Sequence, residues 1–239
     1  LVTPALSGLI IRFFGYQLLF NLGIGIVFVG ILLSAFLDFP KENDDISWSE
    51  FFMWLKDSYF WKLSISIAGR QFHDNALFIW PLYLFIFLGN TEQVGVLYGL
   101  SYLVSMILNF FIGAKLDSKA QKKPFFLSGG ILSFLLVLRM QVFHFWTVTF
   151  IDAVDKITGN FHWLFFDRVM MNRGKGREAF SYFMYREVIV SISVLLFWFL
   201  FSFVFFISSL EWNGLFLFAS GGVLLSLFMD KKHKKNLLQ

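Results

Sequence analysis

The sequence contains no cysteine and unusually few charged residues. Without cysteine, the chain has no disulfide bridge, zinc–thiolate site, iron–sulfur cluster or cysteine nucleophile. Only 15% of the 239 residues are charged, whereas an average soluble domain has about 25%. Apolar residues make up 57% of the chain, and 35 residues are phenylalanine. This composition disfavours both a disordered chain and an ordinary soluble enzyme.

Motifs typical of enzymes and metal sites are also missing. The sequence has no Gly-x-Ser-x-Gly, no P-loop and no His-Glu-x-x-His. Asp152, Asp155, His144 and His162 are potential metal ligands, but neither histidine has a second one four residues away on the same helical face. We therefore expect no enzyme activity, no cofactor and no metal site.

Long apolar segments dominate the chain instead. A bilayer core of about 30 Å requires roughly 20 apolar residues in a helix. Seven segments have about this length: 16–37, 63–88, 93–115, 124–143, 145–166, 183–208 and 212–229. Residues 1–14 are apolar but too short to cross a bilayer, and they lack the basic flank of a signal peptide. We therefore expect an all-α polytopic membrane bundle that begins partway through a helix of a longer protein.

The basic residues predict how the bundle is oriented. Of the 20 lysines and arginines, most lie in alternate connections and the carboxy-terminal tail, within the ranges 38–62, 115–123, 168–186 and 230–239. Cytoplasmic loops carry such an excess, so these connections and the carboxyl terminus are predicted to be cytoplasmic in a multi-pass protein of the cell membrane. Topology then explains the net charge of +4, and a nucleic-acid partner is not expected.

The longest polar interval, residues 38–62, contains a short amphipathic pattern. Its aromatic and apolar residues recur at helical spacing: Trp48, Phe51, Phe52, Leu55 and Tyr59. Ser47 and Glu50 have the spacing of a capping box. We expect a helix at the cytoplasmic interface, with Trp48, Trp54 and Trp61 at headgroup depth. A plain aromatic linker is the alternative.

Two local patterns resemble the major facilitator superfamily of secondary transporters. In one predicted cytoplasmic loop, Gly113 and Asp117 are followed by Lys122 and Lys123, similar to the family's Gly-x-x-x-Asp-Arg-x-Gly-Arg-Arg. Ser118, Ala120 and Gln121 depart from that motif. Near the start, the residues Pro4, Ser7, Gly8, Gly15, Tyr16 and Phe20 resemble the end of the family's fifth helix and the start of its sixth. There Ser7 replaces a glycine and Tyr16 replaces a tryptophan.

The resemblance implies a division of the whole chain. Residues 1–37 would end the amino-terminal half, and 38–62 would be the cytoplasmic linker with its interfacial helix. Residues 63–229 would form the carboxy-terminal six-helix half, and 230–239 a basic cytoplasmic tail. The first four helices of the family would be missing. Gly113, Asp117, Lys122 and Lys123 would form a cytoplasmic gating motif together with Glu187; a structural pair between Glu187 and a basic loop residue is the alternative.

Ionisable residues inside two segments are the candidate functional residues. Segment 63–88 carries Arg70, Gln71, His73, Asp74 and Asn75, and segment 145–166 carries Asp152, Asp155 and Lys156. Charges inside a membrane are costly unless paired or solvated. The resemblance makes these segments the family's seventh and tenth helices, which line the central cavity. Spacing allows two pairs within helices, Arg70 with Asp74 and Asp152 with Lys156, so structural ion pairs and a polar pathway for substrate or protons both remain open.

These observations lead to one expected function and one alternative. We expect a fragment of a secondary active transporter, moving a small solute by alternating access, with Asp74, Asp152 or Asp155 as candidate proton carriers. Its expected partners are membrane lipid, a small-molecule substrate, protons as a candidate coupling ion, and the missing amino-terminal helices of the same protein. The alternative is a non-transporting membrane scaffold or accessory subunit, in which the same charges hold helices together.

Overall fold

The computed structural model describes residues 3–36, 47–116, 122–141, 144–174, 179–207 and 210–229. All the regular structure in these ranges is helical. Within the described residues, eight α-helices and one short 3-10 helix follow one another: α1 (Thr3–Ser34), α2 (Trp48–Lys56), α3 (Ser58–Leu88), α4 (Thr91–Leu116), α5 (Lys122–Leu138), η1 (Arg139–Gln141), α6 (Phe145–Arg173), α7 (Ala179–Ile207) and α8 (Trp212–Ser226).

Each of the seven expected apolar segments corresponds to one helix or helical pair. Two helices extend five or more residues beyond their segments at one end: α3 begins at Ser58, and α6 continues to Arg173. By length and composition, three helices in the described ranges can cross a membrane: Phe13–Ser34, Pro124–Gln141 and Ala179–Ile207. An all-helical membrane protein agrees with this finding. That the other four segments also cross the membrane remains a prediction.

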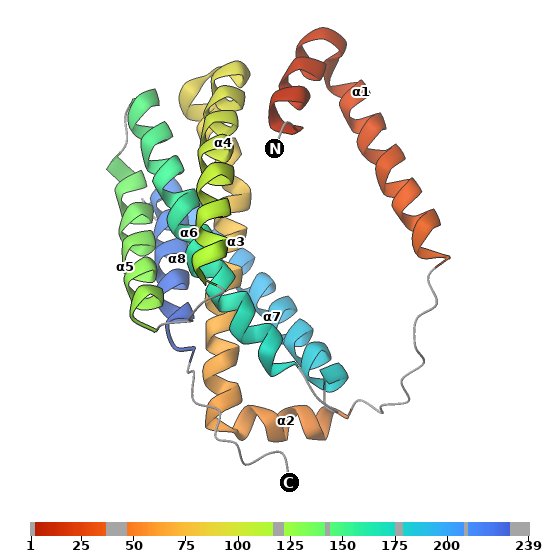
Figure 1. Ribbon diagram of the computed structural model, residues 1–239, viewed down its shortest axis with the longest axis vertical. Helices are drawn as coiled ribbons and strands as arrows, with labels where there is room; N and C mark the ends of the chain where they lie inside the picture. The colour runs from red at the N-terminus through yellow and green to blue at the C-terminus, as the bar shows by residue number, and fades with distance from the viewer. Residues whose placement is uncertain are drawn as a thin grey trace.

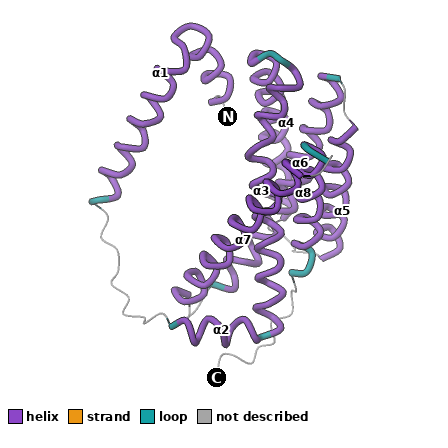
Figure 2. Tube along the Cα trace, turned by 180° about the vertical axis from the view of Figure 1, so that it is seen from behind, coloured by secondary structure: helices purple, strands orange, loops and turns teal. Residues whose placement is uncertain are grey.

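A break at Gly15 divides α1 into two parts. Gly15 has φ of 79° and ψ of 173°, values outside the helical region, and a φ above zero favours glycine because it has no Cβ. Figures 1 and 2 show the chain reversing direction there. The expected connection between residues 1–14 and 16–37 therefore lies where the sequence predicts it. The part after Gly15 carries exposed apolar side chains such as Phe20, Ile26 and Phe28, and the main contacts of α1 are with α4.

The closest crossing in the bundle joins α3 and α8. A Cβ added to Gly222 would meet the carbonyl oxygen of Gly69, and one added to Gly69 would meet that of Gly222. Glycines at both positions therefore let the two backbones approach directly, as small residues do in membrane bundles. By contrast, a Cβ at Gly95 or Gly99 would meet no atom of the described residues within 4 Å. Glycine thus allows close packing at Gly222 of α8, whereas no described neighbour requires glycine at these two positions of α4.

Helix α2 lies crosswise beneath the ends of α3 and α7 (Figure 1). Phe51 is buried there, with its ring centroid 5.3 Å from that of Tyr185. The Tyr185 hydroxyl donates to Glu50 Oε2 at 3.1 Å, whereas the Ser47 side chain makes no capping bond to α2. The helix is as expected, but the capping box is wrong, because Glu50 binds α7 instead. Trp54 also packs inward, 5.4 Å from Tyr185.

Candidate functional site

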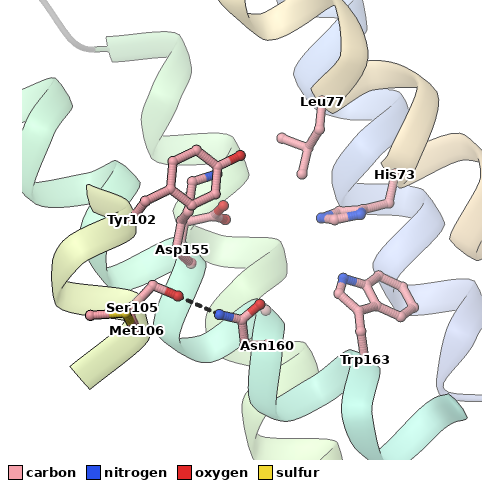
Figure 3. A pocket seen from close by; sticks show the side chains of 10 residues that line it. His73, Leu77, Tyr102, Ser105, Met106, Asp155, Asn160 and Trp163 are labelled. Atoms are coloured by element: carbon pink, nitrogen blue, oxygen red, sulfur yellow. Dashed lines mark hydrogen bonds between the residues drawn. The ribbon is translucent and has the colours of Figure 1, made fainter. Parts of the chain in front are cut away.

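A cavity of about 420 Å³ opens between α3, α4 and α6. Its lining includes His73 and Leu77 of α3, Tyr102 and Ser105 of α4, and a series of α6 residues: Asp155, Lys156, Gly159, Asn160 and Trp163. Figure 3 shows His73 and Trp163 facing Asp155 and Tyr102 across the space. Both segments singled out for their charges therefore contribute to one cavity.

Three polar atoms at the cavity are buried without a hydrogen-bond partner in the described residues. They are Nε2 of His73, Nε1 of Trp163 and Oδ1 of Asp155. His73 and Asp155 are each 3% exposed, and a buried polar atom left unpaired costs roughly 1–3 kcal/mol. Because all three side chains line the same cavity, a polar ligand there can satisfy them.

The tautomer of His73 follows from its other ring nitrogen. Nδ1 of His73 lies 3.0 Å from Oδ1 of Asp74. An ionised carboxylate can only accept a hydrogen bond, so Nδ1 is the donor. In the neutral ring Nε2 then carries no proton and acts as an acceptor. The cavity thus presents acceptors at His73 and Asp155 and a donor at Trp163.

Lys156 provides a second donor at the cavity. Its Nζ lies 4.6 Å from the ring centroid of Tyr102 and 5.5 Å from that of Tyr98. Aromatic faces stabilise an ammonium group modestly, by about 0.5–2 kcal/mol. The pair that spacing allows between Asp152 and Lys156 is not seen among the described residues, where the Asp152 carboxylate binds a guanidinium from another helix.

That guanidinium belongs to Arg139, which η1 carries into the protein interior. Nη2 of Arg139 lies 3.1 Å from Oδ1 of Asp152 and 3.0 Å from Oδ2 of Asp155. The three residues are 1%, 0% and 3% exposed. Trp80 covers this cluster, with its ring 4.3 Å from the Arg139 guanidinium and its Nε1 donating to Asp152 at 3.2 Å. The cluster joins α3, η1 and α6.

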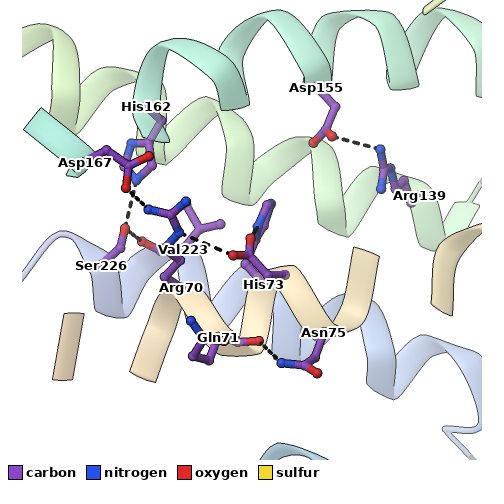
Figure 4. A network of polar contacts seen from close by, with 11 residues as sticks. Arg70, Gln71, His73, Asn75, Arg139, Asp155, His162, Asp167, Val223 and Ser226 are labelled. Carbon is purple, nitrogen blue, oxygen red and sulfur yellow. Dashed lines mark hydrogen bonds and ion pairs between the residues drawn. The ribbon is translucent and has the colours of Figure 1, made fainter. Parts of the chain in front are cut away.

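Arg70 forms a second cluster between α3 and α6. It pairs with Asp74 at 3.3 Å, as the spacing predicts, and also with Asp167 of α6. Its guanidinium carbon lies 5.4 Å from the rings of both Trp163 and Phe166. Figure 4 shows Arg70 reaching towards Asp167. Arg70 therefore links the two helices close to one wall of the cavity.

The other predicted residues lie outside these two clusters. Asn75 donates to the backbone carbonyl of Gln71 at 2.8 Å, within α3 (Figure 4). Glu187 is 3.2 Å from its neighbour Arg186 rather than from a loop residue. Gly113 belongs to α4, and Lys122 and Lys123 begin α5. Asp117 lies outside the described residues, so the gating motif remains a prediction.

Buried His162 fastens α6 to two other helices. Its Nδ1 is 3.2 Å from the hydroxyl of Ser128 in α5, and its Nε2 is 2.8 Å from that of Ser226 in α8. Its ring stacks on Phe125, with centroids 4.4 Å apart. With both nitrogens engaged, His162 acts as a packing residue. The described residues contain no group of three potential metal ligands.

Sequence reasoning missed Arg139, Asp167 and Tyr102 as members of the two clusters and the cavity. Arg139 follows a long apolar run, and that isolation was the available signal of a buried partner. Asp167 and Tyr102 gave no comparable signal, because their roles depend on which helices are neighbours.

No family model, no curated protein and no solved structure matches this chain.

Proposed function

We propose that the chain is the carboxy-terminal part of a facilitator-type secondary transporter, moving a small solute by alternating access. The observation that carries this proposal is the cavity between α3, α4 and α6, lined by buried polar atoms without protein partners. A cavity of about 420 Å³ falls within the range of about 300–1,000 Å³ found for small-molecule sites.

Two further features support a transporter. The break at Gly15 and the crosswise α2 agree with the arrangement that the facilitator resemblance implies, namely two halves joined by a cytoplasmic linker. The apolar side chains of α1 after Gly15 are exposed, which suits contact with lipid or with further helices of an amino-terminal half. Asp155 is our preferred proton carrier, because its carboxylate lines the cavity.

A scaffold or accessory subunit is the second candidate. The buried pairs of Arg139 with Asp152 and Asp155 favour it, because they join helices in the way that structural ion pairs do. A scaffold, however, has no need of unpaired polar atoms around a cavity. The two candidates therefore differ in what neutralising a cavity carboxylate would do.

The test compares uptake and stability in the same preparations. The full-length protein, reconstituted in proteoliposomes, is offered labelled sugars, amino acids, organic anions and organic cations under an imposed pH gradient. We expect uptake of one class, lost in Asp155→Asn. The variant should keep most of its thermal stability, because Arg139 retains its ion pair with Asp152 and a neutral amide is cheaper to bury than a carboxylate. Asp57→Asn is the matched control, because this exposed residue caps α3 and asparagine caps equally well. Absence of uptake for all four classes would favour the scaffold.

A further inference from the structure

The charges around the cavity carry information about the ligand. Two adjacent residues of α6, Asp155 and Lys156, line the same space with opposite charges. No ion pair joins them to each other in the described residues, where Asp155 pairs with Arg139 and Lys156 lies over Tyr102. Asp155, which has one unpaired carboxylate oxygen, and Lys156, which has an ammonium group, thus line one cavity.

The charged residues on the Asp155 and Lys156 side of the cavity balance to zero charge. The Arg70 cluster is not counted with them, because its carboxylates, Asp74 and Asp167, are each 45% exposed and screened by solvent. Arg139 and Lys156 contribute two cations, and Asp152 and Asp155 contribute two anions. A ligand with a net charge would upset this balance in a region of low dielectric, where such interactions are strong. A ligand without net charge is therefore favoured, either a neutral polar molecule or a zwitterion.

The cavity atoms that have no hydrogen-bond partner in the described residues distinguish these two types of ligand. A neutral polyol can bind His73 Nε2 and Trp163 Nε1, but it offers no opposite charge to Lys156 or to Oδ1 of Asp155. A zwitterion offers an anionic group to Lys156 and an ammonium group to Asp155. Charge-assisted hydrogen bonds are about twice as strong as neutral ones, and burial strengthens them further.

We propose that the cavity binds a small zwitterion carrying one ammonium and one carboxylate group. Asp155 Oδ1, supported by His73 Nε2, accepts from the ammonium, and Lys156 with Trp163 Nε1 donates to the carboxylate. Arg139 holds the Asp155 carboxylate in place through its other oxygen. This inference rests on the proposal that the cavity is the substrate site.

The test uses four probes that each contain four carbon atoms: γ-aminobutyrate, butyrate, butylamine and butanediol. Binding to the purified full-length protein is measured by isothermal titration calorimetry. We expect γ-aminobutyrate to bind about tenfold or more tightly than each other probe, because a hydrogen bond to a charged group contributes about 1.5–3 kcal/mol. Equal or tighter binding of any other probe, or no binding of γ-aminobutyrate, overturns the inference.

Two variants test which residue binds each charged group of the zwitterion. Lys156→Gln should weaken γ-aminobutyrate about tenfold and remove its advantage over butylamine, while Asp155→Asn should remove its advantage over butyrate. Lys156→Gln is the decisive variant, because Asp155→Asn also alters the buried cluster around Arg139. Lys62→Gln is the control, because Lys62 is an exposed lysine that does not line the cavity. It should leave the affinity for all four probes unchanged. Unchanged selectivity in Lys156→Gln would overturn the inference.

The outcome is separable from the transporter proposal. Gradient-driven uptake of a sugar or of a singly charged solute, with no binding of γ-aminobutyrate, would refute the zwitterion and leave the transporter standing.

Discussion

The guanidinium of Arg139 lies 3.1 Å from the carboxylate of Asp152, and neither side chain is more than 1% exposed. Such a pair is expensive to desolvate, so its net contribution to stability is small, yet removing one partner leaves an uncompensated buried charge. Because Asp155 shares the same guanidinium, the packing of the bundle and the charge at the cavity depend on one residue.

The first prediction concerns this dependence. Arg139→Leu should lower the free energy of unfolding by about 3–5 kcal/mol, since two buried carboxylates lose their partner. The triple variant that adds Asp152→Asn and Asp155→Asn should recover most of the loss. Arg186→Gln is the control, because its pair with Glu187 is partly exposed and should contribute less than about 1 kcal/mol. Equal unfolding midpoints for Arg139→Leu and Arg186→Gln in detergent would refute the role of the cluster.

The second prediction uses two neighbouring glycines of α8. A Cβ at Gly222 would lie 2.9 Å from Phe72 Cβ and 3.0 Å from His73 N, whereas one at Gly221 would meet no described atom within 4 Å. Gly222→Ala should therefore destabilise the protein by about 1–3 kcal/mol. Gly221→Ala should be neutral or stabilise by up to about 1 kcal/mol, since alanine favours helix. Thermal unfolding of the two variants side by side checks this; the reverse order would mean that α3 and α8 do not cross at Gly222.

The third prediction concerns the docking of α2. The Tyr185 hydroxyl donates to Glu50 and to the Ser47 carbonyl, so Tyr185→Phe removes both bonds while keeping the ring contacts. We expect faster hydrogen exchange in α2, corresponding to a loss of about 1–3 kcal/mol. Exchange in α8 should stay as in the wild type and serves as the internal control. Unchanged exchange in α2 would show that the aromatic contacts alone hold this helix.

The fourth prediction concerns topology. In the cysteine-free background, Gln93→Cys at the start of α4 should react with an impermeant thiol reagent in intact cells. Lys56→Cys at the end of α2 should react only after permeabilisation, because basic connections face the cytoplasm. Strong labelling of Lys56→Cys in intact cells would reverse the orientation.

The fold was largely predictable because helix length and apolar runs are local properties of the sequence. The break at Gly15 and the limits of α4 and α7 follow from such local signals. The pair of Arg70 with Asp74 was predictable for the same reason, since four residues make one helical turn.

The partners across helices were not predictable. Asp152 has Lys156 one turn away, yet it binds Arg139, because η1 brings a guanidinium to the buried side of α6. Glu50 likewise accepts a hydrogen bond from Tyr185 of α7 instead of capping the start of its own helix. Spacing within a helix cannot rank a local partner against a distant one, because the desolvation of each group depends on the packing around it.

Alternating access is the central claim, and a cysteine at Met106 tests it most directly. Met106 lines the cavity from α4 and is 44% exposed. Leu103 on the same helix is the matched control, because it is 51% exposed but is not part of the cavity lining. We predict that Met106→Cys reacts with an impermeant thiol reagent in both right-side-out and inside-out vesicles, because the cavity opens to each face in turn. Leu103→Cys, which the proposed topology places against lipid, should react in neither. Reaction of Met106→Cys from one face alone, or from neither, would contradict the account.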